Sequence, residues 1–217
     1  VVQVNNTDIN GGMHTFGGKP AYAFAAVTKL IPNTVTQAWY YKVPGAATAY
    51  WAQADSNVAG VDLGVQYAGT ELTASGDKTS GFAVKLGYGK GAWSAYGAYS
   101  ATADDATGID ISNIATGLTG ASQSKLYTES YWNYGYVGAR NAKSFAVGGE
   151  YNLSSVKLGA QYTNVTGNNS SMDLKEATVT ASTKLSSVNV DLAYINAEKG
   201  SRKENTVLVM AKLPFNL

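Results

Sequence analysis

The sequence predicts an all-β protein, a transmembrane barrel of antiparallel strands that run up and down. Three observations favour this fold: apolar and polar residues alternate with a period of two, the alternating segments are long, and short connections alternate with longer ones. The segments are mostly about 9–11 residues, the length a tilted strand needs to cross a bilayer, whereas strands of soluble proteins are commonly about 5–6.

Composition points to lipid as the solvent of one face. Only 14% of the 217 residues are charged, while the chain holds 15 Tyr and 24 Gly; ordinary soluble domains have about 25% charged residues. Sixteen basic against 15 acidic residues leave a net charge of +1, which excludes the basic face that nucleic acid requires. The absence of cysteine excludes disulfides and thiolate zinc sites, and no apolar run is long enough for a membrane helix.

Alternation defines two faces. In 61–67, Val61, Leu63, Val65 and Tyr67 fall on one face, and Asp62, Gly64 and Gln66 fall on the other. Segments 82–88, 145–151, 156–162 and 188–194 repeat the pattern. We expect the apolar face to meet lipid and the polar face to line a water-filled pore. The predicted pore-lining residues are Asp62, Gln66, Lys85, Glu150, Lys157, Gln161, Asn189 and Asp191.

Eleven strands follow from these segments. They are predicted at 21–30, 34–43, 47–54, 58–67, 82–89, 92–101, 143–152, 155–164, 176–185, 187–196 and 205–215. Tight turns are predicted at 32–33, 90–91, 152–154 and 186, and longer polar connections at 68–81, 102–142, 165–175 and 197–204. Because outer-membrane barrels have short periplasmic turns and long external loops, 102–142 is predicted as a long external loop.

Aromatic residues recur near the ends of the apolar face. Rings with a polar atom prefer the level of the lipid headgroups, so two belts of such residues are expected of a barrel in a membrane. The predicted belts consist of Tyr41, Tyr67, Tyr99, Tyr162 and Tyr194 at the outer ends, and Tyr88, Tyr151 and Phe215 at the inner ends.

Strand parity predicts a barrel that is incomplete at the N-terminus. A barrel with both termini in the periplasm needs an even number of strands, and the first of these eleven runs downward from the outer side. Val1–Val4 would then end an earlier strand, followed by a loop over 5–19. The whole chain is predicted to be one β-barrel domain, and a closed barrel of about 12 strands is the alternative architecture.

The order of several segments resembles a known family. They are NTVTQAWYYKV, AYWAQAD, GVDLGVQYAG, KLGYGKGAWSAYGAYS, YTESYWNYGY, SFAVGGEYNLSSVKLGAQYTNVTG and NTVLVMAKLPFNL. Together, over about 34–217, they resemble the outer-membrane porins of the Campylobacter-type major outer membrane protein family and the related OprD-like porins. The resemblance implies the second half of a barrel of eighteen strands, in accord with the parity. It also implies passive diffusion of small hydrophilic solutes.

The resemblance has a limit. OprD-like porins that take carboxylates line their eyelet with arginines, and this chain offers only Arg140 and Arg202, both in or next to predicted loops, so carboxylate specificity is not carried over. We expect the outer membrane of a Gram-negative bacterium as the location, with the lipid bilayer and lipopolysaccharide around the barrel and a homotrimer or a monomer as the assembly. The competing hypothesis is an exported, non-channel β-sheet protein, an adhesin or surface-layer component, whose apolar faces pack on each other.

Catalytic and metal chemistry has little support. His14, the single histidine, stands in a glycine-rich predicted loop, so no catalytic residue is predicted and the protein is not expected to be an enzyme. Gly87, Gly89 and Gly91 belong to a strand and its turn rather than to a phosphate loop. Asp104, Asp105 and Asp110 are weak candidates for a loop Ca²⁺ site, but their spacing does not match an EF-hand, and no cofactor is expected.

Overall fold

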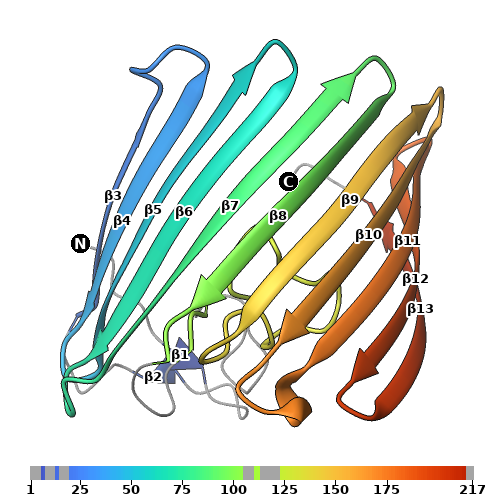
Figure 1. Ribbon diagram of the computed structural model, residues 1–217. Helices are drawn as coiled ribbons and strands as arrows, with labels where there is room; N and C mark the ends of the chain where they lie inside the picture. Colours follow the sequence, from blue (N-terminus) through green and yellow to red (C-terminus); the bar gives the residue numbers. More distant parts are fainter. Residues whose placement is uncertain (1–5, 8–12, 15–19, 105–109, 113–122, 214–217) are drawn as a thin grey trace.

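Eleven strands, β3 to β13, form one antiparallel sheet in which neighbours in the chain are neighbours in the sheet (Figure 1). The structure is a computed structural model and describes residues 6–7, 13–14, 20–104, 110–112 and 123–213. The strands are β3 Tyr22–Thr28, β4 Thr34–Val43, β5 Ala47–Val58, β6 Val61–Leu72, β7 Lys78–Lys90, β8 Trp93–Thr102, β9 Lys143–Leu153, β10 Val156–Thr166, β11 Leu174–Leu185, β12 Val188–Lys199 and β13 Arg202–Lys212.

Two smaller elements accompany the sheet. β1 (Asn6–Thr7) pairs with β2 (Met13–His14) within the segment predicted as a loop, and the 3-10 turn η2 (Ser170–Met172) lies between β10 and β11. In the described residues, no helix is long and apolar enough to span a membrane.

The predicted fold class is confirmed, and each of the eleven predicted strands overlaps an observed one. The predicted connections at 68–81 and 197–204 are wrong in length, because the strands continue past the apolar pattern and leave only 73–77 and 200–201 between them. Backbone pairing extends these strands several residues beyond the alternating apolar pattern. The runner-up architecture, a closed barrel of about 12 strands, is not seen: β3 and β13 are the two ends of the sheet that the described residues form.

Two-residue turns join four of the five strand pairs at the upper end of Figure 1, and residues 29–33 join β3 to β4 there. Ala59 and Gly60 both have positive φ, 53° and 84°, the type of turn that matches the twist of paired strands. A Cβ at position 60 would stand 2.8 Å from the carbonyl oxygen of Gly89, so glycine is required there by contact as well as by φ. At the opposite end the connections range from two residues, 200–201, to the long segment 103–142.

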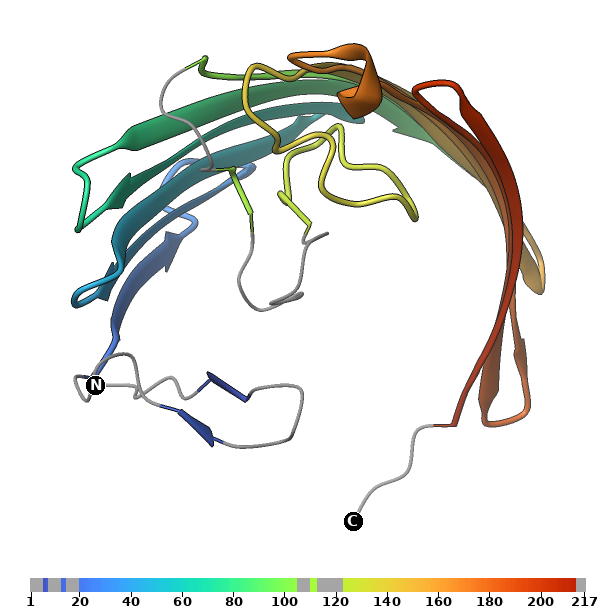
Figure 2. The same ribbon diagram turned by 90° about the horizontal axis from the view of Figure 1, so that it is seen from below.

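The sheet curves into an incomplete cylinder with a concave and a convex face (Figure 2). On the convex face of the described strands, no Asp, Glu, Lys or Arg lies between the two rows of aromatic side chains. Large apolar side chains stand exposed there, among them Leu86 at 60%, Val207 at 66% and Val209 at 67%. A face of this kind needs an apolar solvent or a partner.

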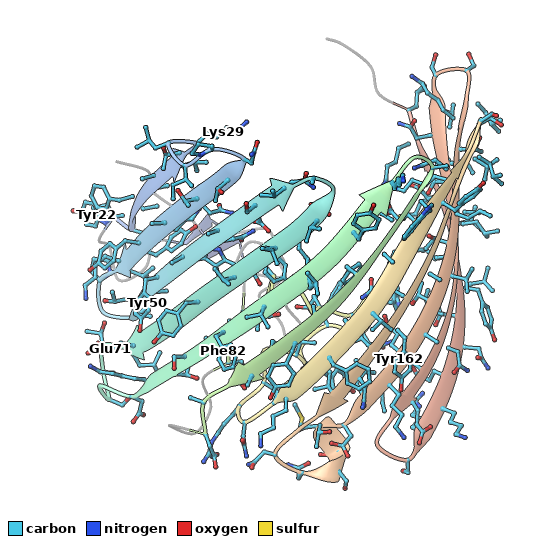
Figure 3. The ribbon with its side chains drawn as sticks, turned by 45° about the horizontal axis from the view of Figure 1, so that its top comes forward. Tyr22, Lys29, Tyr50, Glu71, Phe82 and Tyr162 are labelled. Atoms are coloured by element: carbon cyan, nitrogen blue, oxygen red, sulfur yellow. The ribbon has the colours of Figure 1, made fainter. Side chains whose placement is uncertain are left out.

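Aromatic side chains form two rows on the convex face. Tyr50, Phe82 and Tyr162 stand in the row nearer the long connections (Figure 3), and ring contacts join Tyr50 to Tyr67, Phe82 to Tyr99 and Phe145 to Tyr162 with centroids 5.9–6.2 Å apart. Tyr194 lies on the same face of β12. The second row, near the tight turns, contains Tyr88, Trp93 and Tyr151.

Two of the predicted belt residues, Tyr41 and Phe215, are not among the described residues of the two rows. The register pairs Tyr41 with Ala49 and places it on the concave face beside Trp39, so its assignment to the belt is corrected, and the convex residue of that strand is Tyr40. Three consecutive aromatic residues leave the parity of β4 undetermined in the sequence. Phe215 lies outside the described residues.

Candidate functional site

Away from the end with the long connections, nearly all charged side chains of the strands lie on the concave face. The register places all eight predicted pore-lining residues on it: Asp62, Gln66, Lys85, Glu150, Lys157, Gln161, Asn189 and Asp191. Opposite charges pair across neighbouring strands, as in Lys157–Glu150 at 2.8 Å and Lys212–Asp191 at 3.2 Å. The wall therefore has charges of both signs and little net field.

A segment of the β8–β9 connection, residues 123–142, lies against this wall inside the curve of the sheet (Figure 2). We call it the inward segment. Its Leu126 and Val137 are 2% and 0% exposed and belong to one apolar cluster with Ala83, Val165 and Leu174 of the strands. The sequence predicted a long polar loop at 102–142 on the external side. It did not predict that part of this loop folds back onto the wall.

Glu176 of β11 fastens the inward segment from the wall. Its side chain is buried, and its carboxylate accepts hydrogen bonds from the backbone N–H groups of Tyr131 (2.6 Å), Trp132 (3.0 Å) and Asn133 (2.9 Å), and from the Asn133 amide (2.7 Å). A single carboxylate thus satisfies three consecutive backbone donors, which fixes the path of the segment at this point.

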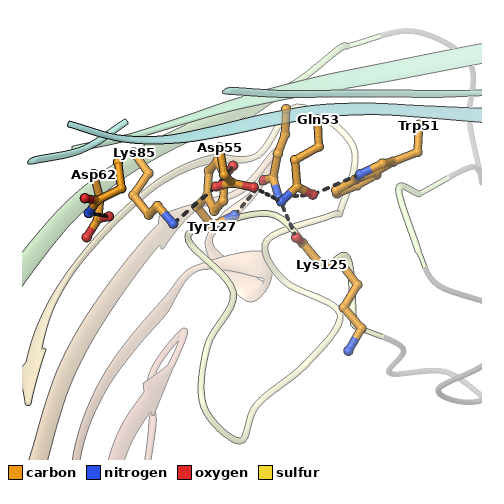
Figure 4. Close-up of polar contacts among 9 residues, drawn as sticks. Trp51, Gln53, Asp55, Asp62, Lys85, Lys125 and Tyr127 are labelled. Atoms are coloured by element: carbon orange, nitrogen blue, oxygen red, sulfur yellow. Dashed lines mark hydrogen bonds and ion pairs between the residues drawn. The ribbon is translucent and has the colours of Figure 1, made fainter. Parts of the chain in front are cut away.

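Asp55 of β5 fastens the segment at a second point (Figure 4). Its carboxylate accepts a hydrogen bond from the Tyr127 hydroxyl at 2.6 Å and pairs with Lys85 Nζ at 3.4 Å. Lys85 Nζ also stands 4.5 Å from the centroid of the Tyr127 ring, a cation–π contact. Tyr127 is therefore held by the wall through both its hydroxyl and its ring face.

Gln66 of β6 extends this contact. Its side-chain oxygen accepts from the Tyr127 backbone N–H at 2.9 Å, and its nitrogen donates to the Lys125 carbonyl oxygen and to Gln53 Oε1, each at 3.2 Å. Gln66 is 6% exposed, so its polar atoms are satisfied by these partners rather than by water. Of the residues in this contact, Gln66 and Lys85 were predicted to be pore-lining, whereas Asp55, Gln53 and Tyr127 were missed.

Burial raises the pKa of two side chains of the inward segment, Tyr127 and Glu129. Burial and the hydrogen bond to Asp55 raise the pKa of Tyr127 well above its usual range, so the hydroxyl stays a donor at physiological pH. Burial also raises the pKa of Glu129, although hydrogen bonds from Ser124 oppose this shift. The Tyr127 hydroxyl is held by Asp55 of the wall, whereas the Glu129 carboxylate accepts from Ser124 within the segment itself.

Gly64 of β6 makes room for the Tyr127 ring, because a Cβ at this position would stand 2.5 Å from the hydroxyl oxygen. We expect Gly64→Ala to push the ring off Asp55 and to weaken docking by about 1–2 kcal/mol. The matched control is Gly97→Ala in β8, where nothing lies within 4 Å of the added Cβ. Faster amide exchange at Tyr127 and Leu126 in the Gly64 variant alone is the expected readout; equal exchange in both variants contradicts it.

Three aromatic side chains on the concave face were also missed. Trp39 and Trp51 are direct cross-strand partners, and the ring of Tyr41 is nearly parallel to that of Trp39, with centroids 6.1 Å apart. Each indole N–H donates to a glutamine oxygen two residues along its own strand, Gln37 and Gln53. These bonds fix the ring orientations and leave no unpaired indole donor in the wall.

The weak Ca²⁺ candidates have other partners. Asp104 pairs with Arg140 at 2.9 Å, and Asp110 accepts a backbone hydrogen bond from Arg140, while burial raises the pKa of Asp110. Asp105 lies outside the described residues. Within the described part of the chain, no group of three or more His, Cys, Asp or Glu side chains is placed to hold a metal ion.

Comparison with solved structures finds the same fold. Pseudomonas aeruginosa OccK11 (OpdR) matches with a TM-score of 0.71 at 10% identity, over 92% of this chain and 58% of that one. Pseudomonas aeruginosa OprD matches with a TM-score of 0.61 at 13% identity, over 92% and 63%. A BenF-like porin from Pseudomonas fluorescens Pf-5 matches with a TM-score of 0.66 at 12% identity, over 93% and 59%.

These matches show that the chain has the fold of OprD-like porins. The chain spans about three fifths of the length of the solved chains. No protein-family model matches the chain, and no curated protein sequence matches it significantly.

Proposed function

We propose that the protein is part of an outer-membrane channel for passive diffusion of small hydrophilic solutes and ions. The observation that supports this most is the division of one sheet into an apolar, charge-free convex face between two aromatic rows and a charged, hydrogen-bonding concave face. Lipid on one side and water on the other is the environment in which both faces are solvated.

The inward segment would narrow the pore. It lies on the concave face, and side chains of the wall hold it at Asp55, Gln66 and Glu176. Gln161 adds a further bond to the carbonyl oxygen of Glu129 at 2.7 Å. A loop fixed at several points of the wall sets a constant constriction, so the rate of diffusion would depend on the fit of the solute rather than on a moving gate.

The similarity of fold supports the proposed location in a Gram-negative outer membrane and the resemblance to OprD-like porins. The finer resemblance, to the Campylobacter-type major outer membrane protein, and the homotrimer remain parts of the proposal. Native mass spectrometry of the detergent-solubilised protein distinguishes a homotrimer from a monomer.

The decisive experiment is reconstitution into a planar lipid bilayer. We expect stepwise, ohmic conductance with no requirement for an energy source. The competing hypothesis, an exported β-sheet protein whose apolar faces pack together, predicts a monodisperse chain without detergent and no conductance. No second sheet covers the convex face in the described residues, where the sheets are this one and the β1–β2 pair.

Weak ion selectivity is a further prediction. Glu150 and Asp191 are paired with Lys157 and Lys212, so replacing the two carboxylates by Gln and Asn leaves two unpaired lysines on the wall. We expect the reversal potential in a salt gradient to move by a small amount towards anions, because such charges are screened within about 8 Å at physiological salt. An unchanged reversal potential would mean that these side chains do not face the conducting water.

A further inference from the structure

The convex face has charged side chains almost only at the end with the long connections. Beyond the aromatic row on this side, its strands carry five lysines and two glutamates: Lys42, Lys78, Lys143, Lys175, Lys203, Glu71 and Glu198. At the tight-turn end, the convex face of the described strands carries Lys90 alone. We call the five lysines the outer lysine collar.

The collar lies at a defined depth. Lys143 precedes Phe145 of the aromatic row by two residues on β9, and Lys78 precedes Phe82 by four on β7, so both stand nearer the long connections than the rings do. Two to four residues of a tilted strand correspond to about 5–10 Å along the bilayer normal. If the rings lie at the hydrocarbon boundary, the ammonium groups lie at the level of the lipid phosphates.

Lys143 and Lys175 form the centre of the collar. They lie on β9 and β11, on either side of β10, where Lys143 is the cross-strand partner of Thr166 and Lys175 that of Asn164. On its other side Lys175 has Glu198 of β12 as cross-strand partner, so Lys143 is the member of this pair with no carboxylate directly opposite. Both lysines are exposed, and neither forms an ion pair with another residue that the structure describes. Strands β9 and β11 are about 10 Å apart, so one phosphate group fits between the two ammonium groups, above the hydroxyl and amide of β10.

We propose that the outer lysine collar, centred on Lys143 and Lys175, binds the phosphate groups of lipid A in the outer leaflet. This inference rests on the proposed function, because it requires the long connections to face the outside. The asymmetry of the two ends favours an anionic partner at this end: five lysines face two glutamates, and the ion pair of Lys78 with Glu71 at 3.3 Å leaves four lysines against Glu198. The collar points away from the pore, so a permeating solute is not its ligand.

The test is binding of diphosphoryl lipid A in detergent micelles, measured by native mass spectrometry and by titration. We expect Lys143→Gln combined with Lys175→Gln to weaken binding about 30-fold, and raised salt to weaken binding to the unmodified chain. The matched control is Lys90→Gln, an exposed convex lysine at the other end, which should bind as the unmodified chain does. Dephosphorylated lipid A should bind weakly to all three proteins.

Three results would overturn the inference: undiminished binding by the double variant, equal binding of dephosphorylated lipid A, or displacement of the lipid by an equal concentration of inorganic phosphate. Inorganic phosphate serves as the free anion, and the proposal requires that it does not displace the lipid at equal concentration. Channel conductance of the double variant separates the two proposals. A double variant that loses lipid binding but conducts like the unmodified chain supports both proposals. Absent conductance in the unmodified chain refutes the channel, and the lipid A titration still decides whether the collar binds phosphate groups.

Discussion

Replacing Glu176 with Leu should release the inward segment from the wall and enlarge the conductance of the channel. The substitution leaves the backbone N–H groups of Tyr131, Trp132 and Asn133 without their acceptor. Hydrogen bonds to a charged group contribute about 1.5–3 kcal/mol each and are not additive, so we expect docking of this part to lose about 3–5 kcal/mol. The three donors then find water by moving into the pore.

Amide hydrogen exchange reports this release directly. Exchange at positions 131–133 should accelerate about 10²–10⁴-fold, and single-channel conductance should rise and become noisier. Glu176→Gln keeps the volume but turns an amide N–H₂ towards these donors, so its effect should be smaller and in the same direction. The control is Glu150→Gln on the same face, because Glu150 forms its ion pair with Lys157 of β10 rather than with the inward segment. Unchanged exchange in the Leu variant would mean that the apolar cluster alone holds the segment.

The sequence predicted the sheet well because the two faces of each strand meet different solvents. In β6 and β7, every second residue from Val61 to Tyr67 and from Phe82 to Tyr88 is apolar, so the sequence itself shows the period of two. The ends of the strands were predicted less well. Outside the aromatic rows both faces can be polar, and only backbone pairing, which leaves no sequence pattern, extends β6 to Leu72.

The site was predicted in part for the same reason. The eight wall residues follow from parity, but Asp55, Ser56 and Asn57 have the composition of a turn and were predicted to be a connection, although they lie within β5. The position of the inward segment depends on contacts between residues far apart in the chain, such as Tyr127 with Asp55. In LKEATVTAS, parity places Glu176 on the polar face, but nothing in the sequence indicates that the side chain is buried beneath the inward segment.

An arginine in place of Leu158 or Leu192 should destabilise the protein in lipid by about 2–4 kcal/mol. Both leucines lie on the convex face, 40% and 47% exposed, with no charged side chain beside them on that face. Leu192 lies in the interior of β12, whereas Leu158 is the third residue of β10 and the cross-strand partner of Tyr151 in the tight-turn row, so the larger cost is expected at Leu192. A guanidinium there must lose its water or reach past the aromatic row, and the cost falls as the position approaches the headgroups. The free energy of unfolding in vesicles, from reversible denaturant titration, measures it.

The control is an arginine at the same depth on the other face. Asp191→Arg removes the ion pair with Lys212, in which the lysine side chain is 61% exposed, and should change the free energy of unfolding by no more than about 1 kcal/mol. Gly159→Arg is less clean, because a Cβ there would stand 2.5 Å from the Thr180 hydroxyl. A difference of 2 kcal/mol or more between neighbouring positions 191 and 192 cannot come from strand propensity, which both share. Equal costs at the two positions would therefore show that the convex face does not meet lipid.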